Sequence, residues 1–275
     1  MTEITLPGGL WLGGAHHRRA ELRPVAGADE VLLAEERSAP PARRVTRLLG
    51  RCVRRIGDVP VEEETVRALT VGDREALLLH LRRLTLGEAM PCVLACPDCG
   101  EKLDLDLRAG DLLLPPYTET RPGWETVVEG RYRVRFRLPA GKDQEAAADC
   151  VERDGAEAAA ALLLRRCVES VEDEEGRPVE DWPAAVAREL PARMAELDPQ
   201  AEISLDLACP ACGRRFSALF DPASYFLGEL GGDPARLFRQ VHSLALHYHW
   251  SEPEILALTP RRRRVYLELL AEAVS

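Results

Sequence analysis

The spacing of apolar residues changes several times along the chain, and each change predicts a different kind of element. Residues 41–56 and 71–86 carry apolar side chains every three or four positions, which predicts two amphipathic helices. Thr70 before the second segment is typical of an N-cap, Asp73 places an acid in the first turn, and Gly87 is typical of a helix end. The boundaries of the 71–86 helix are therefore predicted sharply.

Alternation of apolar and polar residues predicts strands elsewhere. It runs over 93–107, 126–138 and 203–219, and each segment is interrupted by a turn, which predicts three β-hairpins. In the hairpin at 126–138, alternate positions form a cationic face made of Arg131, Arg133, Arg135 and Arg137. A solvated strand face accounts for these arginines, and contact with an acidic partner or with the chain's own acidic segment is the alternative. Residues 1–20, rich in glycine, predict an extended hairpin or arm that docks on the body or on a partner.

The remaining segments predict helices. Short helical segments are expected at 29–37, 143–150 and 156–168, a charged loop at 172–176, and two further helices that begin at Pro183 and Pro191. Residues 221–275 predict a series of helices, because capping residues and first-turn prolines recur at Asp221-Pro222, Asp233-Pro234, Ser251 with Glu254, and Thr259-Pro260.

Four cysteines carry the strongest chemical signal in the chain. Two copies of a Cys-Pro-x-Cys-Gly turn lie more than a hundred residues apart and supply Cys96, Cys99, Cys209 and Cys212. Four thiolates complete the tetrahedral shell of a structural zinc ion, and each glycine permits the positive φ that the turn needs. We therefore predict one structural zinc ion per chain, held between the tips of two hairpins. A closed shell of this kind indicates structure rather than catalysis.

Other interpretations of the cysteines are less favoured than zinc. A disulfide pairing is disfavoured, because no secretory signal is visible at the start of the sequence and a reducing cytoplasm is expected. A redox motif is disfavoured, because such motifs usually occur once. Cys92 is a possible alternative ligand, although its strand position suits a core residue. The other three cysteines are predicted to be buried thiols: Cys52, Cys150 and Cys167.

Together these patterns predict an α+β protein: a helical body with two β-hairpins joined by a zinc-ribbon-like site of four cysteines, and an inserted α/β segment. The expected division is an N-terminal hairpin or arm (1–20), helices plus the first zinc hairpin (21–110), an acidic strand-helix insert (111–200), the second zinc hairpin (201–220) and C-terminal helices (221–275).

Charge narrows the possible partners. The chain carries 36 basic and 46 acidic residues, a net charge of −10, and residues 140–209 hold 18 acidic against 7 basic residues, a local charge of −11. A zinc ribbon suggests nucleic-acid binding, but that needs a basic footprint, so we expect no nucleic-acid partner. No apolar segment is long enough to span a membrane, and a cytoplasmic protein without a membrane partner is expected.

A run of four arginines, 261–264, opens the last predicted helix. Cations at a helix N-terminus oppose the macrodipole, so a contact outside the helix is expected to offset them. Arg261 and Arg264 share one face and are the predicted partner-binding residues, with the insert or a partner as the acidic surface. A solvated helix turn is the alternative.

Motifs of enzyme active sites are not found. The sequence holds no G-x-S-x-G elbow, H-E-x-x-H pair, phosphate-binding loop or dinucleotide fingerprint, and the predicted zinc shell is full. We therefore expect no catalytic residues, no enzymatic activity and no small-molecule substrate.

Several segments, taken in order, resemble the T-even phage-type baseplate hub assembly chaperones of phages and phage-tail-like contractile injection systems. They are the opening 5–9, the stretch 69–79, the first cysteine turn with 103–105 behind it, the stretch 136–143 and the ending 249–270. The resemblance implies a non-enzymatic chaperone or adaptor whose partners are baseplate hub or spike proteins. A permanent structural baseplate subunit, and a zinc-ribbon nucleic-acid-binding or transcription-associated factor, are the alternatives.

Overall fold

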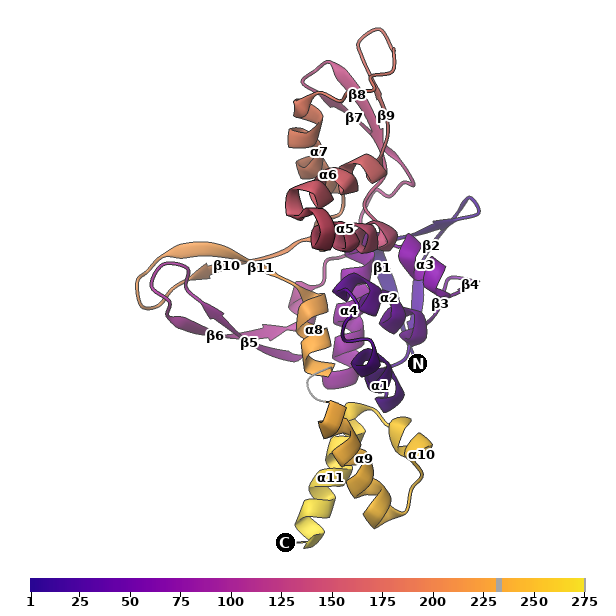
Figure 1. The fold of residues 1–275 in the computed structure, drawn as a ribbon, viewed down its shortest axis with the longest axis vertical. Coiled ribbons are helices and arrows are strands. Elements are labelled where there is room, and N and C mark those ends of the chain that lie inside the picture. The colour runs from indigo at the N-terminus through magenta and orange to yellow at the C-terminus, as the bar shows by residue number, and fades with distance from the viewer. Residues whose placement is uncertain (231–233, 275) are drawn as a thin grey trace.

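A central body carries three projections. The computed structural model describes residues 1–230 and 234–274. Figure 1 shows the insert at one end of the long axis, the last three helices at the other, and two long hairpins extending sideways from the body. Helices and short antiparallel sheets are mixed, so the protein is α+β, as the sequence predicts. None of the helices in the described residues is long and apolar enough to cross a membrane.

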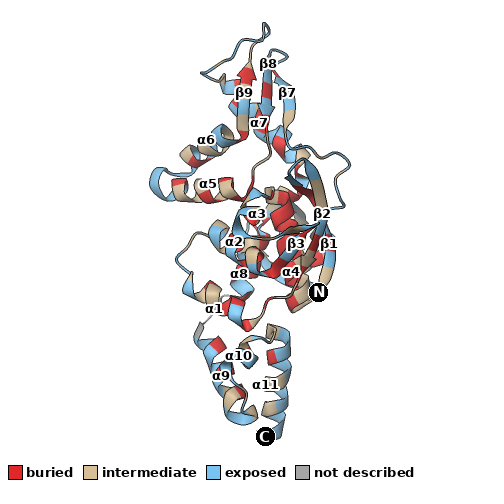
Figure 2. Cartoon of the chain, turned by 90° about the vertical axis from the view of Figure 1, so that its right-hand side faces the viewer, coloured by how far each residue is buried: buried red, intermediate tan, exposed pale blue. Residues whose placement is uncertain are grey.

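The body combines one antiparallel sheet with helices packed on it. The strands lie in the order β1-β2-β3-β4, with bounds Thr2–Leu12, Ala15–Leu22, Val53–Ile56 and Val59–Pro60. The helices are α1 (Gly27–Glu35), α2 (Pro41–Cys52), α3 (Glu63–Ala68) and α4 (Val71–Leu86). Helix α4 lies at the centre and is buried along most of its length (Figure 2). Its leucines share one core with residues from the sheet, from α2 and from α8 (Pro222–Leu230).

Helix α4 begins and ends where its caps predict. The hydroxyl of Thr70 accepts a hydrogen bond from the backbone N–H of Asp73, at 3.3 Å, and Gly87 ends the helix with a φ of 106°. The N-terminal hairpin of β1 and β2 is part of the body, because its strands belong to the body's sheet and the side chains of Leu6 and Leu10 are buried in the core.

The predicted helix at 41–56 is too long. Helix α2 ends at Cys52, and the next four residues form β3, in which Val53 pairs with Leu22 and Ile56 with Ala20. Ile56 lies four residues after Cys52, a spacing that also fits a helix, but pairing with β2 buries it completely. The prediction failed because the sheet partner lies more than thirty residues earlier in the sequence.

The insert is a three-stranded antiparallel sheet with three helices. The strands, in the order β7-β8-β9, are Trp124–Val128, Tyr132–Phe136 and Val168–Glu172, and the helices are α5 (Gly141–Asp154), α6 (Ala156–Cys167) and α7 (Ala184–Leu197). Each of the four alternating arginines forms an ion pair within the insert, with Glu174, Glu125 or Asp143. The acidic insert itself therefore supplies the partners of this face.

Two predictions for the insert were wrong. Strand β9 was not expected, because Val168 and Val171 alone give too little alternation. Helix α7 is one helix where two were predicted, with Pro191 inside it. Val186, Leu190 and Met194 keep helical spacing across this proline and are buried, so their packing offsets the hydrogen bond that proline cannot donate.

The C-terminal helices divide between two cores. Helix α8 belongs to the body, whereas α9 (Pro234–Tyr248), α10 (Glu252–Leu256) and α11 (Pro260–Val274) have a small core of their own. Asp221 caps α8 by accepting from the backbone N–H of Ser224, and Ser251 with Glu254 forms the predicted capping box of α10. The predicted cap at Asp233 lies outside the described residues.

Candidate metal centre

Two β-hairpins bring the four predicted ligands together at their tips. The first consists of β5 (Ala89–Ala95) and β6 (Lys102–Arg108), and the second of β10 (Ile203–Ala208) and β11 (Arg215–Phe220). Both are regular antiparallel pairs, with Leu94 opposite Leu103 and Leu207 opposite Phe216. These two hairpins project sideways from the body (Figure 1). We refer to them together as the arm, and from here on this name does not include the N-terminal residues 1–20.

The arm has a small apolar contact at each end. At its base, Met90, Ala109 and Phe220 pack with Leu79 of α4, which anchors the arm to the body. At its tip, Leu103 packs with Cys96 and Cys209, with Leu105 and Phe216 partly buried beside them. The apolar side chains of each strand alternate with exposed ones, so each hairpin turns one face toward the other.

The four thiols form a compact cluster. All four sulfur atoms lie within 4.8 Å of one another, with 3.8 Å between the Sγ atoms of Cys96 and Cys212 and 3.6 Å between those of Cys99 and Cys209. A tetrahedron with metal–sulfur bonds of about 2.3 Å has edges of about 3.8 Å, which is the separation that these pairs have. A disulfide would need sulfurs about 2.05 Å apart, and all eight cysteines are free thiols. The cluster could therefore hold one metal ion.

Each turn arranges its backbone for thiolate ligands. Gly100 donates to the carbonyl oxygen of Cys96 at 3.0 Å, and Gly213 to that of Cys209 at 2.9 Å. Both glycines have a φ of 73°, which glycine adopts without the strain a Cβ would bring. Backbone N–H groups of Cys99 and Asp98 point at the sulfur of Cys96 and lower the pKa of that thiol. The backbone N–H of Glu101 lowers the pKa of Cys99, but burial and the neighbouring thiols outweigh this effect, so in the absence of a metal that pKa is raised. An ion pair between Arg214 and Asp98, at 2.9 Å, joins the two tips.

The other cysteines lie outside this cluster. Cys92 is half-buried on β5, where it pairs with Leu105, and it is not one of the four clustered thiols. The predicted buried thiols are buried: Cys52, Cys150 and Cys167. Burial raises the pKa of Cys52 to about 12 and that of Cys167 to about 11, so neither is a reactive thiolate at neutral pH. Within the described residues, the four tip thiols are the one group of three or more potential ligands close enough to share an ion.

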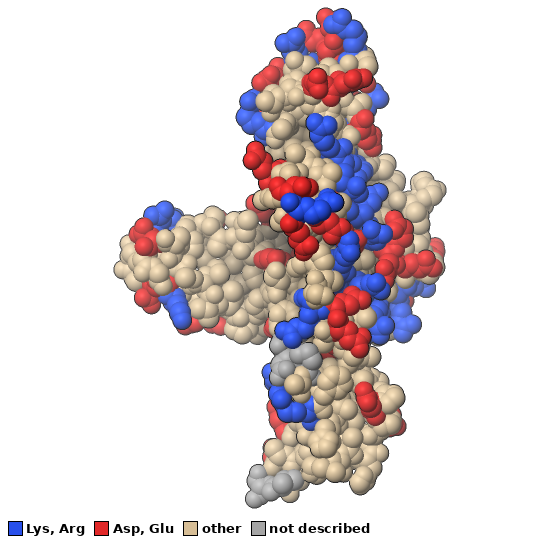
Figure 3. All heavy atoms as spheres, viewed as in Figure 1, with Lys and Arg blue, Asp and Glu red and all other residues tan. Residues whose placement is uncertain are grey.

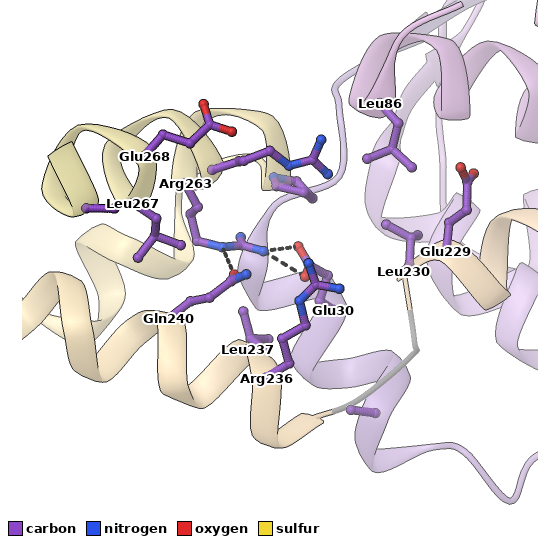
Figure 4. Close-up of a pocket in the computed structure, with 14 residues that line it drawn as sticks. Glu30, Leu86, Glu229, Leu230, Arg236, Leu237, Gln240, Arg263, Leu267 and Glu268 are labelled. Carbon is purple, nitrogen blue, oxygen red and sulfur yellow. Dashed lines mark hydrogen bonds and ion pairs between the residues drawn. The ribbon is translucent and has the colours of Figure 1, made fainter. Parts of the chain in front are cut away.

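A second joint, which sequence reasoning missed, attaches the C-terminal helices to the body. Arg263 is only 1% exposed, and its guanidinium donates to both carboxylate oxygens of Glu30 on α1, at 2.6 and 2.7 Å (Figure 4). Arg263 also donates to the carbonyl oxygen of Leu258 and to Gln240. This ion pair is an external contact that offsets one of the four cations at the start of α11, that of Arg263.

The remaining arginines of the run are exposed. Arg261 and Arg264, the predicted partner-binding residues, lie on the surface, and no described contact assigns them a role. A sequence signal did exist for Arg263, because it shares a helix face with Leu267 and Leu270, whereas Arg261 does not.

A buried polar cluster fixes the start of α4 close to the base of the arm. The carboxylate of Asp73 accepts from the backbone N–H groups of Gly8 and Gly9, both at 2.8 Å, and lies within hydrogen-bonding distance of Thr70. Two residues near the ends of the insert extend the cluster: Asp198 accepts from the N–H of Gly72 and from the hydroxyl of Tyr117. Burial raises the pKa of Asp73 to about 6. These bonds hold β1, α4 and both ends of the insert together.

Comparison with known proteins identifies the family. Residues 17–227 match the protein family described as T4 bacteriophage base plate protein. The chain belongs to this baseplate family. The matched region includes both hairpins of the metal centre and the whole insert, and it ends in α8 before the last three helices. No curated protein and no solved structure matches the chain. Membership confirms the resemblance to T4-type baseplate proteins and supports a baseplate-related role.

Proposed function

We propose that the protein is a non-enzymatic assembly chaperone or adaptor for the baseplate hub of a contractile, phage-tail-like injection system. Membership of the baseplate family is the observation that carries this proposal. The fold supports it, because a small body presents three separate projections over which a partner could be held (Figure 1). The proposed partners are hub or spike proteins, and the proposed place of action is the cytoplasm in which the particle is built.

The metal of the four-cysteine site is proposed to be one structural zinc ion per chain. Four thiolates at tetrahedral separations suit zinc, and a full protein shell leaves no position for a reacting water. Cys96, Cys99, Cys209 and Cys212 would hold the ion. Its contribution would be to keep the two hairpin tips together, and the arm's surface rather than the metal would meet the partner.

The surface supports protein binding more than nucleic-acid binding. Charged side chains gather at the tip of the arm, while much of its length in the view of Figure 3 is uncharged. Val93 and Leu219 on the arm are 58% and 71% exposed, and they supply apolar surface that a protein partner could cover. Arg261 and Arg264 remain proposed contacts for an acidic partner. The net charge of −10 disfavours the nucleic-acid alternative.

Deleting the gene in a producing strain tests the proposal. We expect particles that lack hubs, or no particles at all, and we expect the chain itself to be absent from purified wild-type particles by mass spectrometry. Stoichiometric amounts of the chain in finished particles would instead favour the permanent structural subunit. Normal particles from the deletion strain would contradict both roles.

Two measurements on the purified protein test the zinc and the partner class. Elemental analysis should find about one zinc per chain, and a fully folded protein without zinc would contradict the metal proposal. A gel-shift assay at physiological salt should show no DNA or RNA binding. Tight, salt-sensitive binding would favour the zinc-ribbon nucleic-acid factor instead.

The exposed arginines have their own test. The double variant Arg261→Ala with Arg264→Ala should fold normally and bind the purified hub or spike protein more weakly. Equal binding by the variant and the wild type would remove these residues from the partner surface.

A further inference from the structure

A pocket at the base of the arm lies where four parts of the fold meet. Its walls come from the first turns of α2, α4 and α8 and from the strand ends that lead into and out of the second hairpin. Apolar side chains predominate in these walls, among them Pro41, Val45, Val71 and Phe220. Leu219, 71% exposed, stands at the same site on β11. The pocket is therefore an apolar recess beside an exposed apolar residue.

One acid in this pocket, Glu75, has no hydrogen-bond partner in the part of the chain that the structure describes. Glu75 on α4 is 8% exposed, and among the described residues no side chain or backbone group forms a hydrogen bond or ion pair with its carboxyl group. Its Oε2 atom is fully buried and unsatisfied. Asp73, two residues earlier on the same helix, is also buried, but it is bonded to Gly8, Gly9 and Thr70. A buried carboxyl group without any partner is costly and rare in folded proteins.

The electrostatic surroundings favour a cation in this pocket. Asp221 and Glu202 also line it, so its described lining carries three acids and one base. That base, Arg74, donates from its two terminal nitrogens to Thr46 and to the carbonyl oxygens of Val66 and Ala42, while its buried Nε forms no hydrogen bond among the described residues. Its charge lowers the pKa of Glu75, but less than burial raises it. Burial, and next the negative charge of Asp221, raise the pKa of Glu75 to about 8. An entering cation would restore the ionised form of Glu75 and give it a partner.

We propose that this pocket binds a lysine or arginine side chain presented by a partner protein. Such a side chain has an aliphatic stem that suits the apolar walls and a cationic head that suits Glu75 and Asp221. That the partner is a hub or spike protein rests on the proposed chaperone function. The pocket's preference for a cation rests only on its own residues. Leu219 at the rim packs against the segment that carries the basic residue.

One substitution at Glu75 should weaken partner binding without lowering stability, which distinguishes a binding role of this residue from a structural one. Glu75→Gln keeps the shape of the side chain and removes its charge. We expect the free protein to melt at the same or a higher temperature, and its affinity for the purified hub or spike protein to fall about 30-fold or more. Glu35→Gln, which removes the same charge from an exposed position on α1, is the matched control and should leave both quantities unchanged.

Equal affinity of Glu75→Gln and Glu35→Gln for a partner that binds the wild type would overturn the pocket proposal while leaving the chaperone function intact. If the wild type binds neither the hub nor the spike protein, the proposed chaperone function is wrong. Photo-crosslinking in the producing cells then tests whether the pocket binds a basic side chain of another partner. For this experiment, a benzophenone amino acid replaces Leu219 in the full chain. A crosslinked segment that contains lysine or arginine, and that disappears with Glu75→Gln, supports the pocket. A segment without a basic residue, or no crosslink, overturns it.

Discussion

The metal centre and the Arg263–Glu30 joint both connect segments that are distant in the sequence, but in opposite surroundings. The cysteine pairs stand at the tips of two thin hairpins, with only a few apolar side chains beside them. Arg263 and Glu30 lie between helices, and α9 to α11 already bury an apolar core of their own. The comparison teaches that a segment too thin to bury much apolar surface would gain most from the proposed metal–ligand bonds, whereas packed helices need only a contact that fixes their orientation.

Among these predictions, removal of the proposed metal ion should cause the largest loss of stability, and the loss should be confined to the arm. Structural zinc contributes on the order of 10 kcal/mol to small zinc domains, so chelation, or Cys99→Ser with Cys212→Ser, should separate the hairpin tips. Hydrogen exchange should accelerate throughout β5, β6, β10 and β11 while Leu77 and Leu78 of α4 stay protected. Cys92→Ser should keep the zinc and the protection of the arm. Unchanged exchange in the metal-free arm would mean that its apolar contacts suffice.

Breaking the ion pair between Arg263 and Glu30 should lower the free energy of unfolding by less than metal removal does, although the loss should still be large. Arg263→Ala leaves Glu30 buried without its cation, a change that typically costs about 3–5 kcal/mol. Urea denaturation monitored on the C-terminal helices should show this loss. Arg261→Ala, at an exposed position of the same run, should change stability by less than about 0.5 kcal/mol. Equal losses in the two variants would show that Arg263 does not orient the helices.

Lowering the pH should open the metal centre before it affects the Arg263–Glu30 contact. Metal binding requires deprotonated thiols, so zinc should be released as the pH falls below neutral. Burial raises the pKa of Glu30 above its ordinary value, despite the opposing effect of Arg263. The folded state then binds the proton before the unfolded state does, so the contribution of Glu30 to stability rises as the pH falls through that raised pKa toward the lower pKa of the unfolded chain. A zinc-release dye and exchange rates in α11, followed from pH 7 to 5, should show the arm opening first; simultaneous opening would contradict this order.

The smallest expected effect concerns the uncompensated cations of α11. Arg262 is exposed in the first turn, where its charge opposes the helix macrodipole. Arg262→Ala should therefore stabilise the protein by about 0.3 kcal/mol at low salt, and this gain should vanish at high salt. Thermal melts at two ionic strengths measure it. A loss of stability would indicate that Arg262 has a favourable contact of its own.

Local signals were predicted well because their causes are local. The Thr70 cap, the Ser251–Glu254 capping box and the alternation of the metal-site hairpins each depend on residues within a few positions of one another. The four ligands could be grouped from the sequence because two identical turns imply one tetrahedral shell. Their geometry in the structure agrees with that grouping.

Features that depend on distant partners were missed. Ile56 fits a helical spacing, but it lies in a strand because it pairs with β2. Val168 likewise begins a strand because it pairs with Phe136 of β8. Arg263 shares a helix face with two leucines, which hints that it faces inward, but its acidic partner Glu30 lies 233 residues earlier and could not be predicted. Glu75 has no sequence signature at all, because a lack of partners becomes visible only when the surrounding fold is known.

The long separation between the two cysteine turns also affects the order in which the molecule is made. Cys99 and Cys209 are 110 residues apart, and the whole insert is synthesised between them. A ribosome releases the second pair of thiols only after the insert has emerged, so a nascent chain that stops earlier holds half a ligand set. Metal binding by all four thiols would then require a chain that extends at least to Cys212, with the whole insert already made.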